Sequence, residues 1–484
     1  MDLQKKLMVA TWHGLIWRFL ERCSSQIVSL IVSIVLARLL LPEQYGLIAM
    51  TMIFVALSEV FVTSGLGTAL IQKSEYNEVE FSTMFWASIV FSLLLYSILF
   101  LLAPYISMLM HTPELTIVLR ILGLRLPISA MNSIQQAYVS QQMIFKKFFF
   151  STLSGTIFSG IVGLVMAYGN FGVWALVGQN LSMTIVNTGV LYYLIPWRPS
   201  FHFSVRAFKA LYGFSWRIMI TSFIGTFFDQ LRGFLIGRYY TPADLAYVNR
   251  GGQFPSLLAG NISITLQSVL FPAFSHLKDN KEAMRDAVRK YLIVGGFIVA
   301  GVMSVMAGTA DSLIEIILTP RWIDAVPYLQ CVCLLECFGI LGAINLQTIK
   351  ALGRADILLK LEFIKKPIYF IIIIVGALIS PFAIVVGNTI YNIIGFALNA
   401  WPNKNLLNYR LYDQCKDCII PILIAIGNFF ILQQIQHVLP HTISFLLFEG
   451  IGGIFIYLLI SRLLHILGAE YICKMIKNMV QQRR

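Results

Sequence analysis

The sequence predicts an all-α, polytopic membrane protein with about 14 transmembrane helices. Of the 484 residues, 58% are hydrophobic and only 12% are charged, and the mean hydropathy is +0.77. Soluble domains are usually about 45–50% apolar and about 25% charged, so the chain lacks the polar shell of a water-soluble protein. Its apolar residues also form a close succession of windows, each near the ~20 residues that cross a bilayer. Together these observations exclude a soluble domain, a disordered chain and a disulfide scaffold.

Fourteen apolar windows are long enough to cross a bilayer. Several of them are weak at one end, so twelve spans is the alternative count. The windows cover roughly residues 14–40, 44–69, 81–106, 115–140, 148–169, 172–196, 210–237, 251–275, 291–318, 325–349, 357–379, 382–401, 418–438 and 442–468.

The distribution of basic residues supports these windows and gives an orientation. The net charge is +13, which can indicate nucleic-acid binding. Here the termini and the even-to-odd loops, which share one side, carry twenty-three Lys and Arg, whereas the opposite loops carry four. Because cytoplasmic loops collect Lys and Arg, we expect a multi-pass protein of the inner (plasma) membrane with both termini in the cytoplasm. We expect no nucleic-acid partner.

An internal repeat divides the chain. Residues 37–42 resemble residues 237–242, and residues 130–132 resemble residues 343–345. Six spans per half make the repeats parallel, and such halves often enclose a substrate site. We therefore expect an N-terminal lobe over residues 1–200 with spans one to six and a C-terminal lobe over 201–405 with spans seven to twelve. The last two spans and a cytoplasmic tail form a peripheral segment over 406–484.

Polar side chains recur every three or four residues on the first, fourth and seventh spans, which places them on one face of each helix. A charge near the bilayer centre costs at least ~2.5–3.5 kcal/mol, so these faces should line a wet cavity. The excess of arginine favours an anionic substrate such as a phosphate or pyrophosphate. Anchoring in lipid headgroups and helix–helix contact are the alternatives. The candidate substrate-binding residues are Arg18, Arg22, Gln26, Arg125, Asn132, Arg217 and Arg232.

Three intramembrane carboxylates, Glu59, Asp229 and Glu336, are candidates for coupling transport to H⁺ or Na⁺. A purely structural partner is the alternative for each of them. We expect no cofactor and no metal centre, because nothing completes a zinc site around Cys415 and Cys418. The sequence also lacks a GxxxxGK[ST] phosphate loop and an HExxH motif. The chain is therefore not expected to be an enzyme.

Several short motifs together resemble a known family. In this order they resemble the Wzx-type polysaccharide or O-antigen flippases of the polysaccharide transport family, within the multidrug/oligosaccharidyl-lipid/polysaccharide (MOP) superfamily. The colanic-acid exporter type is the most similar, and the resemblance covers about residues 5–470. The motifs are Val35-Leu36-Ala37-Arg38-Leu39-Leu40-Leu41-Pro42 with Tyr45-Gly46-Leu47, Ser64-Gly65-Leu66-Gly67 followed by Leu70-Ile71-Gln72, Leu270-Phe271-Pro272-Ala273-Phe274, Trp322 with Pro327, and Ala351-Leu352-Gly353-Arg354-Ala355-Asp356.

The resemblance implies a MATE-like fold, in which two six-helix lobes form a V and two further helices lie at the periphery. It also implies a secondary transporter that flips undecaprenyl-diphosphate-linked oligosaccharide from the cytoplasmic to the periplasmic (outer) leaflet, for capsule, exopolysaccharide or O-antigen (lipopolysaccharide) assembly. The carrier-linked glycan and membrane lipid would be its partners, with the polysaccharide polymerase machinery as a further one. Ser64-Gly65 departs from the acidic turn of many relatives. Three alternatives stay open: a cation-coupled multidrug exporter, a lipid II flippase of the same superfamily, and a non-transporting membrane scaffold.

Overall fold

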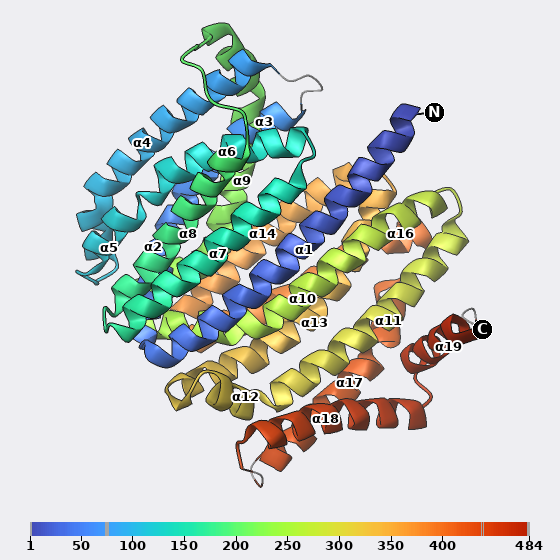
Figure 1. Ribbon diagram of the computed structural model, residues 1–484. Helices are drawn as coiled ribbons and strands as arrows, with labels where there is room; N and C mark the ends of the chain where they lie inside the picture. Colours follow the sequence, from blue (N-terminus) through green and yellow to red (C-terminus); the bar gives the residue numbers. More distant parts are fainter. Residues whose placement is uncertain (1, 73–76, 437, 439, 482–484) are drawn as a thin grey trace. The chain divides into compact units, whose positions relative to one another are not determined.

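In the computed structural model, every regular element of the described residues, 2–72, 77–436, 438 and 440–481, is helical (Figure 1). The chain divides into two compact units, Met1–Ala246 and Tyr247–Arg484. The first unit contains α1(Asp2–Leu39), α2(Pro42–Thr63), α3(Leu66–Gln72), α4(Glu78–Leu109), α5(Leu115–Leu122), α6(Arg125–Gln141), α7(Phe145–Tyr168), α8(Val173–Leu194) and α9(Val205–Tyr239). From α10(Pro242–Leu277), which contains the boundary, the second unit continues with α11(Lys281–Gly308), α12(Ala310–Ile317), the 3₁₀ helix η1(Pro320–Ala325), α13(Val326–Ala351), α14(Ala355–Ala377), α15(Pro381–Ala400), α16(Asn403–Leu407), α17(Leu411–Gln436), α18(Ile443–Leu463) and α19(Leu467–Gln481).

Each of the fourteen predicted windows coincides with a long helix or with two consecutive helices. Within the described residues, eleven segments are long and apolar enough to cross a membrane. The windows on α8, α9 and α14 fall outside that criterion because they are richer in polar or charged residues. Many large apolar side chains of α4 and α18, including Leu101, Met108 and Ile451, are exposed. Such a surface fits contact with lipid chains, so a multi-pass membrane protein is confirmed.

The helix α2 ends at Thr63, and α3 begins at Leu66 after a break at Ser64-Gly65. A Cβ atom on Gly65 would lie 2.2 Å from Cγ of Met219, so the break before α3 lies close against α9. The corresponding residues 264–265 of the second half continue a single helix, α10. The two halves therefore share the order of their motifs. They differ at this point, because the helix is interrupted in the first half and continuous in the second.

In the first unit, α7 packs against α1 and α8, and the Ser151 hydroxyl of α7 donates a 2.6 Å hydrogen bond to the carbonyl oxygen of Asn187 on α8. An aromatic cluster packs α4 and α6 against the segment after α8. Its ring centroids lie 5.8 Å apart for Phe81 and Trp197 and 6.2 Å apart for Tyr138 and Trp197. These contacts fix α6 and α8, two of the helices that line the site described below.

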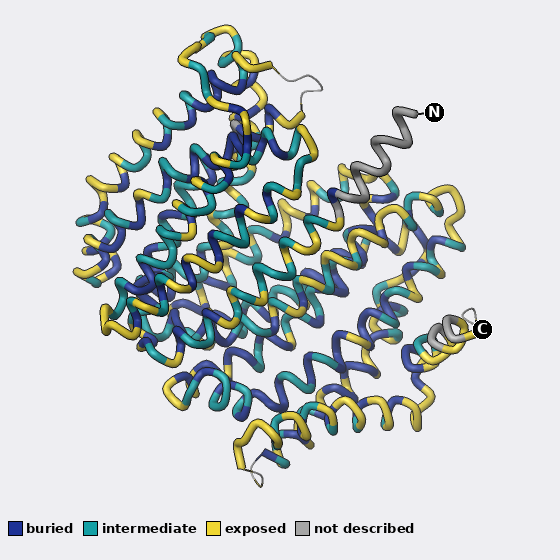
Figure 2. The backbone as a smooth tube through the Cα atoms, in the orientation of Figure 1, coloured by how far each residue is buried: buried dark blue, intermediate teal, exposed yellow. Residues whose placement is uncertain are grey.

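In the second unit, α11 is largely buried (Figure 2) and packs against α13, α17 and α18. Polar groups hold these helices together. The Tyr457 hydroxyl of α18 donates to the carbonyl oxygen of Phe297 at 2.9 Å, and the Asn428 amide of α17 donates to Ser304 Oγ at 3.0 Å. The last two long helices thus belong to the packing of this unit.

The boundary between the compact units lies within α10, whereas the lobe boundary expected from the repeat lies at residue 200. The helix α9 packs against α2, α3 and α4, and these contacts place it with the first unit. The division expected from the repeat stays a prediction. It comprises two lobes, 1–200 and 201–405, and a peripheral segment, 406–484.

Candidate functional site

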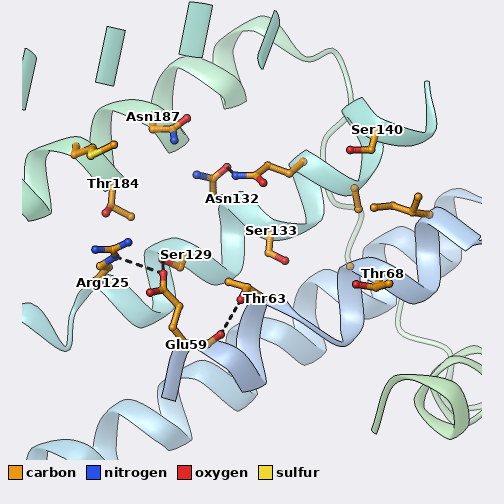
Figure 3. Close-up of a pocket in the computed structure, with 15 residues that line it drawn as sticks. Glu59, Thr63, Thr68, Arg125, Ser129, Asn132, Ser133, Ser140, Thr184 and Asn187 are labelled. Carbon is orange, nitrogen blue, oxygen red and sulfur yellow. Dashed lines mark hydrogen bonds and ion pairs between the residues drawn. The ribbon is translucent and has the colours of Figure 1, made fainter. Parts of the chain in front are cut away.

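A polar pocket of about 270 Å³ lies in the first unit, between α2, α3, α6 and α8 (Figure 3). Fifteen residues line it, and most of them carry hydroxyl, amide or charged groups. They are Glu59, Thr63, Gly67, Thr68, Ile71, Arg125, Ser129, Asn132, Ser133, Gln136, Ala137, Ser140, Met183, Thr184 and Asn187.

At one end of the pocket, Glu59 of α2 meets Arg125 and Ser129 of α6. The Ser129 hydroxyl donates a 2.6 Å hydrogen bond to Glu59 Oε1, and Arg125 Nε lies 3.4 Å from the same oxygen. Arg125 Nε has no hydrogen-bond partner of good geometry despite this contact. The guanidinium is thus held by charge rather than by the aligned pair of bonds that Arg–carboxylate bridges often form.

Arg125 and Glu59 are the ionisable residues among those that line the pocket, so their formal charges cancel when both are ionised. This balance differs from the cationic cavity expected from the sequence, because Glu59 offsets Arg125. Both side chains are partly accessible, with relative exposures of 26% for Arg125 and 20% for Glu59. An anion entering the pocket could therefore reach the guanidinium and compete with the carboxylate.

The polar residues predicted to share one face of the fourth span do lie on one face of α6. Arg125, Ser129, Asn132 and Gln136 recur every three or four residues and all line the pocket. The Gln136 amide donates to Asn132 Oδ1 at 3.2 Å, so the middle of the stripe is a chain of neutral polar groups. Two of the residues predicted to bind substrate, Arg125 and Asn132, thus lie in one pocket with the predicted coupling residue Glu59.

Helix α8 was not predicted to contribute to the site, yet its Thr184 and Asn187 point into the pocket opposite α6 (Figure 3). Asn180, Thr184 and Asn187 follow one another at spacings of four and three residues. That spacing is the same signal that identified α6.

The polar residues of the first span do not line this pocket. The guanidinium of Arg18 lies 4.1 Å from the ring centroid of Phe148 and 4.8 Å from that of Phe145, both on α7. Arg18 also pairs with Glu21 at 3.7 Å, so it contributes to the contact between α1 and α7. Arg22 is exposed, and Gln26 is half-buried.

The polar residues of the seventh span also lie apart from the pocket. Arg217 is exposed and its guanidinium lies 5.9 Å from the ring centroid of Trp216. Asp229 is exposed, and Arg232 is half-buried. None of the three is among the residues that line the α6 pocket.

In the second unit, Glu336 of α13 accepts a 2.8 Å hydrogen bond from the Ser256 hydroxyl of α10. A smaller pocket of about 220 Å³ lies between α13, α14 and α15, and its lining includes Lys365, Tyr391 and Asn392. Lys365 is buried and pairs with Glu362 at 2.7 Å. Among the described residues, no group of three or more His, Cys, Asp or Glu side chains could hold a metal ion.

Comparisons with known proteins agree with this architecture. A family model described as "Polysaccharide biosynthesis protein" matches residues 35–327. The succinoglycan biosynthesis transport protein ExoT of Rhizobium meliloti (strain 1021) is 23% identical over 71% of this chain and 69% of its own length. The teichuronic acid biosynthesis protein TuaB of Bacillus subtilis (strain 168) is 26% identical over 62% of each chain. The lipopolysaccharide biosynthesis protein WzxC of Escherichia coli (strain K12) is 22% identical over 71% of this chain and 70% of its own.

Two solved structures share the fold. The lipid II flippase MurJ in an inward closed conformation aligns with a TM-score of 0.75, covering 93% of this chain and 99% of its own at 14% identity. An inward-facing multidrug resistance MATE family transporter of the MOP superfamily aligns with a TM-score of 0.59, covering 85% and 96% at 14% identity. The expected all-helical MOP fold is thereby confirmed. The names of the relatives describe transport and polysaccharide biosynthesis, in agreement with the expectation that the chain is a transporter and no enzyme.

Proposed function

The chain belongs to the polysaccharide biosynthesis protein family, and from this premise we propose that it flips an undecaprenyl-diphosphate-linked oligosaccharide across the bacterial inner membrane. The glycan moves from the cytoplasmic to the periplasmic leaflet by alternating access, for capsule, exopolysaccharide or O-antigen assembly. The lipid tail stays in the bilayer while the diphosphate and the sugars occupy a polar pocket. The relatives ExoT and WzxC, named for succinoglycan and lipopolysaccharide biosynthesis, support this class of substrate.

The single observation that carries the proposal is the loose contact between Arg125 and Glu59 inside the α6 pocket. A guanidinium binds phosphate oxygens through two parallel N–H donors, and Arg125 Nε has no aligned acceptor of its own. Asn132, Ser133 and Thr184 line the same pocket and offer neutral donors and acceptors for sugar hydroxyls. The pocket thus combines one anion-binding group with a polar wall.

Glu59 gives this binding a proton-coupled step. While Glu59 is ionised, it neutralises Arg125 and competes with the diphosphate. When the carboxyl group takes up a proton, the pocket gains one positive charge and the diphosphate binds Arg125. When the proton leaves, the charge balance returns and the anion binds more weakly. A ligand shifts a conformational equilibrium only by its differential affinity for the two states. Glu336 and Asp229 are the further candidates for coupling to H⁺ or Na⁺.

Flipping by the purified full-length chain in proteoliposomes tests the proposal. Three probes separate the substrate classes: a fluorescent undecaprenyl-diphosphate oligosaccharide, fluorescent lipid II and a fluorescent organic cation. We expect a proton gradient to stimulate flipping of the oligosaccharide carrier. Transport of the organic cation alone would favour a multidrug exporter, and flipping of lipid II alone would assign a peptidoglycan precursor. Inactivity of well-folded protein toward all three, over several glycans, would favour a scaffold.

A further inference from the structure

A buried carboxylate, Glu449, lies on α18, outside the two predicted six-span repeats. Its relative exposure is 2%, although it sits in a segment apolar enough to cross the membrane. Glu449 Oε2 accepts one long hydrogen bond of 3.4 Å from the Gln436 amide, and Oε1 has no hydrogen-bond partner. An ionisable group inside a membrane segment is rare and points to a functional role.

Two further polar side chains, from two other helices, surround this carboxylate. Gln436 at the end of α17 is 5% exposed and Ser312 of α12 is 1% exposed. The Gln436 amide nitrogen donates to Ser312 Oγ at 3.1 Å as well as to Glu449. Its amide oxygen, Oε1, is buried and has no donor. The cluster therefore holds two buried acceptor oxygens, one on Glu449 and one on Gln436, that lack a positive partner.

No charged side chain of the packed helices balances Glu449 in the part of the chain that the structure describes. The apolar stretches of α11 (residues 292–308) and α17 (residues 419–436) contain no Lys, Arg or His. On α12, Asp311 and Glu315 add negative charge rather than remove it, and Glu315 contacts the ring of His441. A buried charge is stable only when it is paired or when it coordinates a cation.

We propose that Glu449, Gln436 and Ser312 form a binding site for one small monovalent cation, with sodium as the ion. A carboxylate, an amide oxygen and a hydroxyl are the hard oxygen ligands that such ions prefer. The amide nitrogen of Gln436 faces Glu449 and Ser312 in the structure, so ion binding would turn this amide to present its oxygen. The ion would then link α12, α17 and α18. This site lies in the second unit and shares no residue with the α6 pocket, so it stands independently of the proposed flipping.

The position of the cluster gives the ion a short path. Glu449 is the seventh residue of α18, about 9 Å along the axis from its first residue at 1.5 Å per residue. Ser312 is the third residue of α12 and Gln436 the last residue of α17. All three ligands therefore lie within two turns of a helix end. In the predicted topology this is the periplasmic end, where sodium is abundant.

The test uses the full-length chain in detergent without any glycan substrate. Binding of radioactive sodium is measured by equilibrium dialysis, and Tm is measured in sodium, potassium and choline chloride at equal ionic strength. We expect sodium to raise Tm relative to choline in wild type, because a ligand that binds the folded state stabilises it. Glu449→Gln should lose one bound sodium per chain and the sodium-dependent part of the Tm shift. Glu315→Gln, on the same helix as Ser312 but paired with His441, should keep both.

Two results would overturn the proposal. Wild-type protein that binds no sodium would show that Glu449 is no sodium ligand. Full sodium binding by Glu449→Gln would place the ion elsewhere. If Glu449→Gln does not fold, Gln436→Leu, which removes the amide oxygen but keeps a side chain of similar size, provides the same comparison. The sodium-binding test contains no glycan substrate, so its result does not depend on whether the protein flips a glycan. Failure of the sodium site and failure of the proposed flipping can therefore be told apart.

Discussion

Ser129 on α6 donates a 2.6 Å hydrogen bond to Glu59 on α2. The second half contains a related pair with the roles exchanged, since Ser256 on α10 donates to Glu336 on α13 at 2.8 Å. The sequence repeat matches α2 with α10 and α6 with α13. Each half therefore joins the same two helices through a hydroxyl and a carboxylate, although the acid comes from a different helix. This arrangement makes both carboxylates candidates for the proton on which the proposed cycle depends.

Replacing Glu59 by Gln should strengthen anion binding. The amide keeps the shape of the protonated carboxyl group but no longer neutralises Arg125, which lies 3.4 Å away. We expect the Kd for a diphosphate carrier at neutral pH to fall by about tenfold, equivalent to ~1.4 kcal/mol.

Binding of a fluorescent carrier at neutral pH measures this effect. Glu362→Gln is the control, since Glu362 pairs with Lys365 in the second unit, away from the α6 pocket. Unchanged affinity in Glu59→Gln would separate Glu59 from anion binding.

Replacing Gly46 by Ala should destabilise the fold. A Cβ atom at Gly46 would lie 1.7 Å from the carbonyl oxygen of Pro242, a backbone atom that cannot rotate away. We expect a loss of at least about 1–3 kcal/mol, the usual cost of overpacking, and a lower Tm in detergent. Gly225→Ala is the matched control, because nothing lies within 4 Å of the Cβ position there. A lower Tm for the control than for Gly46→Ala would contradict this account.

Replacing Asp417 by Asn should loosen the contact between α11 and α17. Two Arg289 nitrogens each donate a 2.8 Å hydrogen bond to Asp417, and the Tyr409 hydroxyl donates to it at 2.7 Å. Burial and the adjacent carboxylate raise the pKa of Tyr409, so this hydroxyl stays protonated and keeps donating at alkaline pH. We expect a loss of about 1.5–3 kcal/mol, typical of hydrogen bonds to a charged group.

The measurement is Tm in detergent from neutral to alkaline pH, where the wild-type contact should persist. Asp356→Asn serves as the control because it removes an exposed pair with Arg354, and it should change Tm little. Equal Tm values for the two variants would show that the contact of Asp417 with Arg289 and Tyr409 adds no stability.

The positions of the helices could be predicted well because hydropathy reports the membrane directly. The windows at 44–69, 115–140 and 291–318 each contain a break, at Ser64-Gly65, at Gly123-Leu124 and at Thr309. Hydropathy does not detect such breaks, because they depend on close contacts such as that of Gly65 with Met219. Local composition thus predicts which segments cross, and tertiary contacts decide where a helix is interrupted.

The candidate site could be predicted only in part. Helical spacing brought Arg125, Ser129 and Asn132 to one face of α6. The contact of Arg125 with Glu59 joins residues far apart in the sequence, and no periodicity reports it. Arg18 has the same spacing signal but stacks on Phe148, because a periodic face can serve packing as well as binding. The charge of a side chain and its helical spacing do not show whether a polar face lines a pocket or packs against another helix.

The central claim is that Arg125 binds the diphosphate during flipping. The most direct measurement compares flipping of a fluorescent undecaprenyl-diphosphate oligosaccharide by wild type, Arg125→Glu and Arg206→Glu in proteoliposomes under a proton gradient. Arg206→Glu makes the same change of charge at an exposed position of α9. We predict that Arg125→Glu loses gradient-stimulated flipping while remaining folded and inserted, and that Arg206→Glu retains it. Flipping by Arg125→Glu at the wild-type rate would contradict the account.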